Sequence, residues 1–230
     1  METLEEIREA LKRLHAGDRR SIESWLRALD PEPVTEKPVQ DALPTYATTD
    51  PSFMTLQEYL AFEEKSLRKH EFVNGVVFAM TGVSVAHAHI TRNLVVAFAA
   101  RAKGGPCNVF ASELRLLIQR GTNEMSYYPD VVVDCRPDTR GTHCVRDPKL
   151  IVEVLSRSTQ GVDRRAKLQN YRLIDSVEEY VLVAQEERRV IIYPRAEGWK
   201  PRVYEGSDAA VEFRSIGLAV PLNEVYGDVS

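Results

Sequence analysis

Two acidic residues stand within or beside runs of apolar residues, where an ionised side chain is unusual. Asp130 follows Tyr128-Pro129 and precedes three valines, and Glu153 lies inside the run Leu150–Leu155. Burying an ionised carboxylate is costly unless it is paired or binds a metal ion. Two such groups on adjacent strands would repel each other, and a hard cation such as Mg²⁺ relieves that repulsion. Singly, Asp130 is as well explained by a turn cap and Glu153 by an arginine partner; together they favour a metal site.

A basic segment follows the second of these runs. Residues 157–172 carry five basic residues against one acidic residue, Asp163. The basic residues are Arg157, Arg164, Arg165, Lys167 and Arg172. Asp163, Lys167 and Tyr171 recur at helical spacing and share one face of the expected helix. Cations beside metal-binding carboxylates are typical of phosphodiester hydrolysis, with Arg157, Arg164 and Arg165 expected to contact phosphates in a salt-dependent way. The alternative is a solvated helix face.

The elements that must position these residues follow from local patterns. Thr55 and Glu58 form a capping box for a helix over 56–65, and Asn74-Gly75 between apolar runs predicts a hairpin over 70–80. Further expected elements are a helix capped by Ser84 and ended by Gly104, strands over 107–118, 127–133 and 150–155, a helix over 164–173 capped by Asp163, paired strands over 180–183 and 190–193, weaker strands at Val203 and Phe213, and a closing helix at Pro221. This order predicts an α/β or α+β fold, with a mixed sheet flanked by helices.

Composition divides the chain into three regions. Residues 1–29 have the apolar spacing of two amphipathic helices, and residues 30–52 contain five prolines and read as a linker. The apolar runs that are expected to form a hydrophobic core lie in residues 53–230. The helical extension, with Trp25 on its apolar face, is a candidate for docking a partner protein or a second copy of the chain.

The overall composition excludes several classes of protein. The 230 residues carry a net charge of −4, which rules out a uniformly basic nucleic-acid coat but leaves room for a local basic patch. The three cysteines, Cys107, Cys135 and Cys144, form no CxxC pair, which argues against a disulfide framework or a structural zinc site and suits the cytoplasm. No apolar run is long enough for a membrane span, and the amino terminus lacks the apolar core of an export signal.

Spaced motifs over about residues 54–229 resemble one bacterial family. The motifs are Met54-Thr55-Leu56-Gln57-Glu58-Tyr59, His70-Glu71-Phe72-Val73-Asn74-Gly75, Ser84-x-x-His87-x-x-Ile90-x-x-Asn93-Leu94, Tyr128-Pro129-Asp130, residues 148–156, and Ser158-Thr159 followed by Asp163, Lys167 and Tyr171. The chain is identified on these motifs as a member of the Uma-type putative restriction endonuclease family, which belongs to the PD-(D/E)XK nuclease superfamily.

The resemblance implies roles for individual residues. It implies a restriction-endonuclease-like core in which Asp130 and Glu153 bind Mg²⁺ or Mn²⁺, with Glu71 completing the site and the Val154 carbonyl as a further ligand. The superfamily pattern has a lysine two residues after the glutamate, where this chain has Leu155. Lys167 on the following helix is the expected substitute, because its long side chain can reach back to the strand end. The implied activity is endonucleolytic hydrolysis of nucleic acid, with DNA favoured, and the implied assembly is a homodimer.

Other readings stay open at this point. His87 could contact nucleic acid, or cap its helix or fill the core; Arg115 could face the site or form a salt bridge. A serine hydrolase is disfavoured because no Gly-x-Ser-x-Gly elbow is present. A binding module for nucleic acid or protein, with the nuclease-like fold but little or no catalysis, is the main functional alternative, and the absent in-line lysine favours it.

Overall fold

The computed structural model describes residues 54–80, 82–136, 143–155, 166–206 and 209–229. All of these belong to one of the two compact units of the chain, Thr48–Ser230. The expected helices over 1–29 and the expected linker over 30–52 lie outside the described residues, as does Asp163, the expected helix cap. No helix in the described ranges is both long and apolar enough to cross a lipid bilayer.

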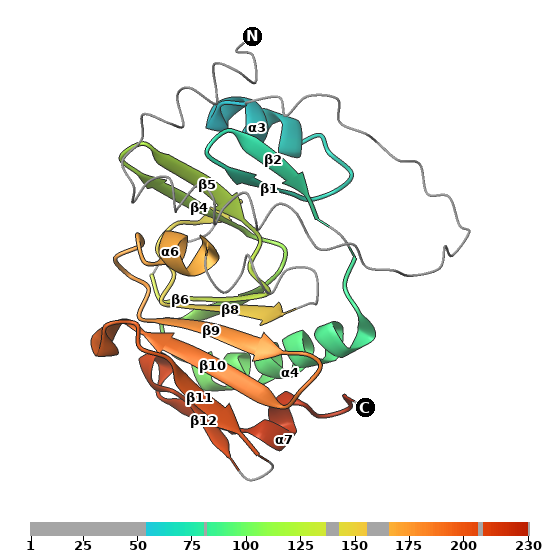
Figure 1. Ribbon diagram of the computed structural model, residues 1–230, viewed down its shortest axis with the longest axis vertical. Coiled ribbons are helices and arrows are strands. Elements are labelled where there is room, and N and C mark those ends of the chain that lie inside the picture. Colours follow the sequence, from blue (N-terminus) through green and yellow to red (C-terminus); the bar gives the residue numbers. More distant parts are fainter. Residues whose placement is uncertain (1–53, 81, 137–142, 156–165, 207–208, 230) are drawn as a thin grey trace, which may run out of the picture. The chain divides into compact units, whose positions relative to one another are not determined.

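A six-stranded mixed sheet forms the centre of the unit (Figure 1). In spatial order its strands are β11 (Arg202–Glu205), β10 (Arg189–Pro194), β9 (Glu179–Ala184), β8 (Leu150–Leu155), β6 (Val131–Asp134) and β3 (Asn108–Ala111). Strands β8 and β9 are parallel, and the other neighbours are antiparallel. Every residue of β8 is buried, as the continuous apolar run over 150–155 predicts for a central strand.

A second sheet has five strands, and a third has two. The five-stranded sheet runs in the order β2 (Val76–Ala79), β1 (His70–Val73), β5 (Asn123–Tyr127), β4 (Arg115–Arg120) and β7 (Cys144–Val145), and the small sheet pairs β12 (Ala210–Phe213) with β13 (Leu218–Pro221). The described helices are α3 (Leu56–Glu63), α4 (Val85–Ala102), α6 (Leu168–Tyr171) and α7 (Leu222–Val225), with 3₁₀ turns at Arg195–Glu197 and Arg214–Ile216. The expected single mixed sheet is thus divided into separate sheets.

Two expected strands are each divided between the two larger sheets. The run 107–118 becomes β3 in the six-stranded sheet and β4 in the five-stranded sheet, and the run 127–133 ends β5 and begins β6. Pro129 explains the second break, because proline has no N–H to donate to a ladder. Predicting either run as one strand was therefore wrong. The two segments in which the chain passes from one sheet to the other, here called the crossovers, lie side by side. The Ser112 hydroxyl of the first donates to the Asp130 carbonyl of the second over 3.4 Å.

Local signals for the hairpin and the first helix are confirmed. Asn74 and Gly75 have φ angles of 46° and 98°, as a tight two-residue turn requires, and β1 and β2 flank them. The Thr55 hydroxyl accepts from the Glu58 backbone, and the Glu58 carboxylate accepts from the Thr55 backbone over 2.8 Å. Helix α3 is therefore capped reciprocally, as the sequence predicts.

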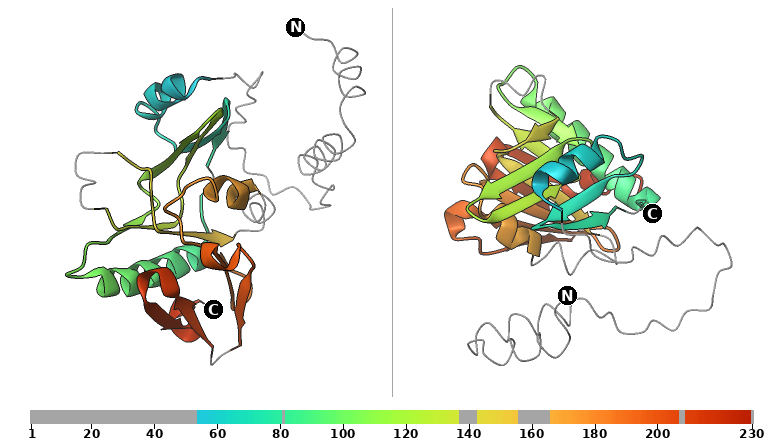
Figure 2. Two further views of the ribbon diagram at one scale, coloured as in Figure 1. Left: turned by 90° about the vertical axis from the view of Figure 1, so that its left-hand side faces the viewer. Right: turned by 90° about the horizontal axis from the view of Figure 1, so that it is seen from above.

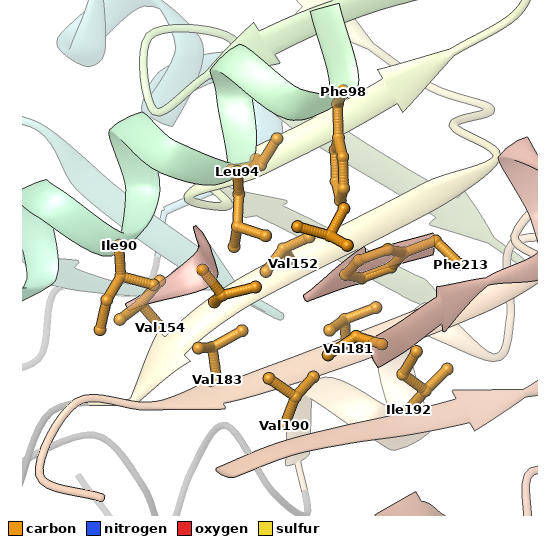
Figure 3. Packing of buried hydrophobic residues seen from close by; sticks show 14 of the residues in the cluster. Ile90, Leu94, Phe98, Val152, Val154, Val181, Val183, Val190, Ile192 and Phe213 are labelled. Atoms are coloured by element: carbon orange, nitrogen blue, oxygen red, sulfur yellow. The ribbon is translucent and has the colours of Figure 1, made fainter. Parts of the chain in front are cut away.

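Helix α4 covers one face of the six-stranded sheet with the residues that its apolar spacing predicts. Ile90, Leu94 and Phe98 are buried against valines of β8, β9 and β10, and the Phe98 ring meets Phe213 edge-on at 4.8 Å (Figure 3). On the opposite face, Tyr171 and Tyr180 belong to a second core shared with the five-stranded sheet. Strand β8 therefore lies between two apolar layers, with α4 on one side and α6 on the other (Figure 2).

Cysteine usage departs from the sequence expectation. Cys107 and Cys135 form a disulfide, and Cys144 takes no part in it. The register explains the pairing: Asn108 faces Asp134 across β3 and β6, so the two cysteines stand opposite each other one position beyond the ladder. The expectation of three separate thiols was wrong, because it considered spacing along the chain and not pairing across strands.

Candidate active site

Asp130 lies where the start of β6 meets the end of β8. Val131 pairs with Val152 in the antiparallel ladder, so Asp130 comes next to the Glu153–Val154 peptide. One oxygen of its carboxylate, Oδ2, accepts a hydrogen bond from the Val154 N–H over 2.7 Å. Asp130 is buried, with 8% of its surface exposed. The structure thus brings the two sequence-predicted acidic residues to one edge of the sheet.

His87 reaches the same carboxylate from the first turn of α4. Its Nε2 lies 2.8 Å from Asp130 Oδ1, and both side chains are buried. Ser84 caps the helix by accepting from the His87 N–H over 3.1 Å, and its hydroxyl also donates to Gln185 beyond the end of β9. The helix cap therefore positions His87, and His87 together with a backbone amide fixes the orientation of Asp130.

Glu153 is contacted by two residues of the following segment. Lys167 Nζ lies 3.0 Å from Glu153 Oε1, and the Tyr171 hydroxyl donates to the same oxygen over 2.7 Å. The i, i+4 spacing of these two residues, which predicts a shared helix face, accounts for the joint contact. Burial raises the pKa of Tyr171 well above its ordinary value, so this hydroxyl stays a proton donor. Among the described residues, the groups that contact this carboxylate are the Lys167 ammonium and the Tyr171 hydroxyl.

Glu71, on β1, meets the same lysine. Lys167 Nζ lies 3.0 Å from Glu71 Oε1, but at an angle outside hydrogen-bond geometry, and this buried oxygen has no hydrogen-bond donor within the described part of the chain. The lysine ammonium also lies 5.3 Å from the centre of the Tyr127 ring. Lys167 therefore lies between the buried carboxylate of Glu153 and the partly buried carboxylate of Glu71, which come from different sheets.

The outcome differs among the remaining sequence-predicted residues. Arg157, Arg164 and Arg165 lie outside the described residues. Arg115 is buried, and no salt bridge joins it to any residue that the structure describes. Tyr171 is fully buried and also donates to Glu153. Its spacing from Lys167 was the signal for this second role.

Helix α3 supports β1, the strand that carries Glu71. The fully buried Tyr59 donates to the His70 carbonyl over 2.6 Å and lies within hydrogen-bond distance of Ser126. Burial, the largest cause, raises the pKa of Tyr59 to about 12. A tyrosine whose pKa is raised in the folded state stabilises the fold below its unfolded pKa of about 10, and this stabilisation is lost as the pH rises toward 12.

We expect Tyr59→Phe to lower the free energy of unfolding by about 1 kcal/mol at neutral pH, because the hydroxyl loses its hydrogen bonds. Between pH 10 and pH 12 the unfolding free energy of the variant should fall less steeply than that of the wild type. Urea denaturation followed by circular dichroism across this range measures both effects. Parallel curves for the two proteins would show that Tyr59 ionises as freely in the folded state as in the unfolded one.

The fold resembles that of a solved nuclease-like protein. A crystal structure described as a putative nuclease belonging to DUF820, from Anabaena variabilis, matches with a TM-score of 0.62. The match covers 75% of this chain and 97% of that chain, at 20% sequence identity. The expected restriction-endonuclease-like α/β core is thereby confirmed as a fold.

Sequence comparison gives the family. A family model named Uma2 and described as "Putative restriction endonuclease" matches residues 56–223, and the chain belongs to that family. Two relatives from Synechocystis sp. are uncharacterized protein slr1290 and uncharacterized protein sll1609. The first is 34% identical over 174 residues, covering 74% of this chain and 90% of the relative. The second is 33% identical over 172 residues, covering 73% and 95%. Family and fold together support a nuclease-like function.

Proposed function

We propose that the protein is a metal-dependent endonuclease that hydrolyses phosphodiester bonds of nucleic acid, with DNA as the favoured substrate. One observation carries the proposal: buried Asp130 and Glu153 lie at opposite positions in the β6–β8 register, and a lysine ammonium contacts the glutamate. Carboxylates with a nearby cation are the groups that metal-assisted phosphodiester hydrolysis uses. Membership of the Uma2 family agrees with this chemistry.

The donor chemistry at this edge fits a hard divalent cation. Among the described residues no group of three or more His, Cys, Asp or Glu side chains could hold a metal ion. Mg²⁺, however, is commonly held by one or two carboxylates and waters, so Asp130 and Glu153 suffice as protein ligands. The buried Glu71 oxygen without a hydrogen-bond donor is a further candidate ligand. A bound Mg²⁺ or Mn²⁺ would supply Lewis-acid activation of water and neutralise charge on the phosphate.

The other residues at this edge would position these groups. Lys167 would stabilise negative charge that develops on the phosphate, and its second carboxylate partner, Glu71, would hold the ammonium between the two sheets. Because His87 is buried against Asp130, we assign it to orienting that carboxylate, in preference to the nucleic-acid contact that was one of its alternatives from the sequence. Arg157, Arg164 and Arg165 remain the proposed phosphate contacts.

Cleavage of supercoiled plasmid DNA tests the proposal. The wild-type protein should nick or linearise the plasmid with Mn²⁺ or Mg²⁺ and leave it intact in EDTA. Glu153→Gln should lose the cleavage, because a neutral amide is a poorer ligand for a hard cation. Absence of cleavage by the wild type with either cation, on duplex and on single strands, would count against the nuclease.

A binding module is the second candidate function, and a specific contact pattern favours it. Asp130 Oδ2 already accepts a hydrogen bond from the Val154 N–H, and Oδ1 lies within hydrogen-bond distance of His87 Nε2. Lys167 is already paired with two carboxylates. Such satisfied groups are also found in structural networks. This candidate predicts salt-sensitive nucleic-acid binding that is unchanged by Asp130→Asn, whereas the nuclease predicts metal binding that the same substitution removes.

The proposal extends to assembly and location. We assign the protein to the cytoplasm, where nucleic-acid substrates are available, and we keep the homodimer as the proposed assembly. Residues 1–29 are the proposed docking segment for a partner protein. Each of these assignments stands on the sequence and on the family resemblance.

A further inference from the structure

Arg115, the first residue of β4, carries a buried charge that no carboxylate of the described residues pairs with. Only 8% of its surface is exposed, and its buried Nη1 atom has no hydrogen-bond acceptor among the described residues. Leaving such a charge desolvated and unpaired is costly, so a buried arginine is normally found with an anion.

The position of Arg115 follows from the strand register. Leu116 pairs with Tyr127 and Leu117 with Ser126, so Arg115 comes opposite Tyr128 at the end of the β4–β5 ladder. Only Pro129 separates Tyr128 from Asp130. Arg115 is therefore placed at the crossover between the two larger sheets, beside the segment that carries the proposed metal ligand.

The carboxylates near this crossover are already engaged. Glu63 accepts hydrogen bonds from the Tyr128 hydroxyl and the His70 backbone, each over 2.9 Å, and also contacts the His70 ring. Glu113 is exposed and paired with Lys69, whose ammonium lies 5.5 Å from the centre of the Tyr128 ring. Tyr128 thus has a lysine nearby and an arginine opposite, and none of the carboxylates in the described ranges forms a salt bridge with the arginine.

From this arrangement we infer that Arg115 binds a phosphate of the nucleic-acid backbone beside the candidate active site. The inference rests on the proposed function for the identity of the anion. The planar guanidinium presents paired N–H donors that match phosphate oxygens, which lysine cannot do. A substrate strand that places one phosphate at Asp130 would then place another phosphate of the same backbone on Arg115.

Equilibrium binding without catalysis tests the inference. A fluorescein-labelled DNA duplex is titrated with the full-length protein in EDTA, and anisotropy is recorded at several salt concentrations. Arg115→Met should weaken binding about tenfold and reduce the salt slope by about one, because one phosphate contact is lost. Arg115→Lys should keep part of the affinity, because it keeps the charge but not the paired donors.

Arg120→Met is the matched control. It removes a positive charge from the same strand, but Arg120 is about half exposed and paired with Asp147 at 3.5 Å. Binding by this variant should stay within about twofold of the wild type. Equal losses of affinity for the two variants would show a general charge effect and would overturn the assignment.

Thermal unfolding separates a binding role from a structural one. Methionine has nearly the length of arginine and no charge, so Arg115→Met should leave the melting temperature unchanged or raise it. A lower melting temperature with an unchanged salt slope would show that Arg115 is structural and would overturn the inference. So would failure of the wild-type protein to bind the duplex at all.

The outcomes also distinguish this inference from the proposed function. Duplex binding that depends on Arg115, without cleavage in any divalent cation, would support the phosphate site and contradict the nuclease. Cleavage that depends on Asp130, with binding unaffected by Arg115→Met, would support the nuclease and overturn the phosphate site.

Discussion

Replacing Asp130 by asparagine is expected to reduce metal-dependent cleavage by about 10³-fold or more. The carboxylate is the proposed metal ligand at the start of β6, and the loss of several kcal/mol of charge stabilisation corresponds to this factor. The fold should persist, because an amide oxygen can still accept from the Val154 N–H that now donates to Oδ2. Initial cleavage rates on a labelled duplex, with melting temperatures measured alongside, give both quantities.

Asp134→Asn is the matched control for this experiment. Asp134 is a buried aspartate at the other end of β6, where it pairs with Arg136 over 2.8 Å. Its replacement should lower stability while leaving the cleavage rate per folded molecule unchanged. If Asp134→Asn reduced that rate as much as Asp130→Asn, the effect would belong to the strand and not to the proposed ligand.

Lys167→Met is expected to lower the free energy of unfolding by about 3–5 kcal/mol and to remove cleavage. The ammonium lies 3.0 Å from an oxygen of Glu71 and 3.0 Å from an oxygen of Glu153, and its side chain is only 7% exposed. Removing the cation leaves the buried Glu153 carboxylate and the partly buried Glu71 carboxylate without this compensation, which is the costly way of breaking such a pair. Urea denaturation gives the change in stability.

Two further variants define the origin of that loss. Lys149→Met breaks an exposed pair with Glu178, at 3.4 Å, and should cost no more than about 1 kcal/mol. Adding Glu153→Gln to Lys167→Met should restore part of the lost stability, because one uncompensated charge disappears. A double variant less stable than Lys167→Met would contradict the like-charge explanation.

Much of the fold could be predicted because the apolar runs, turn residues and helix caps in the sequence agree with the elements and the burial that the structure shows. All residues of the run 150–155 except Glu153 are apolar, so neither face of the strand is suited to solvent. The run forms the fully buried β8. Asn74-Gly75 can adopt the positive φ angles of a tight turn, and the hairpin forms there. Ser84 and Thr55 offer hydroxyls to helix amides, and both helices begin where these caps predict.

The division of the strands could not be predicted from periodicity alone. An apolar run reads the same whether it stays in one sheet or crosses to a second one, and the runs 107–118 and 127–133 both cross. The Cys107–Cys135 disulfide was missed for a related reason, since it depends on the pairing of β3 with β6. Register between strands distant in sequence is a tertiary property, set by packing on both faces.

Part of the site could be predicted because the sequence places charged residues within or beside apolar runs that are expected to be buried. Asp130 and Glu153 stand out as carboxylates against apolar strands, and Lys167 and Tyr171 share a helix face that meets Glu153. The roles of His87 and Arg115 could not be read in this way. A histidine on an amphipathic helix and an arginine at a strand end are ordinary. Only the fold shows that the histidine contacts Asp130 and that the arginine is buried without a salt bridge to any described residue.

Calorimetric titration with Mn²⁺ is the most direct test of metal binding at Asp130, on which the nuclease depends. Wild-type protein and Asp130→Asn are titrated in parallel, each alone and with a short duplex present. We predict saturable binding by the wild type that is lost in the variant. Equal binding by both proteins, or no binding by the wild type even with the duplex, would contradict a metal site at Asp130.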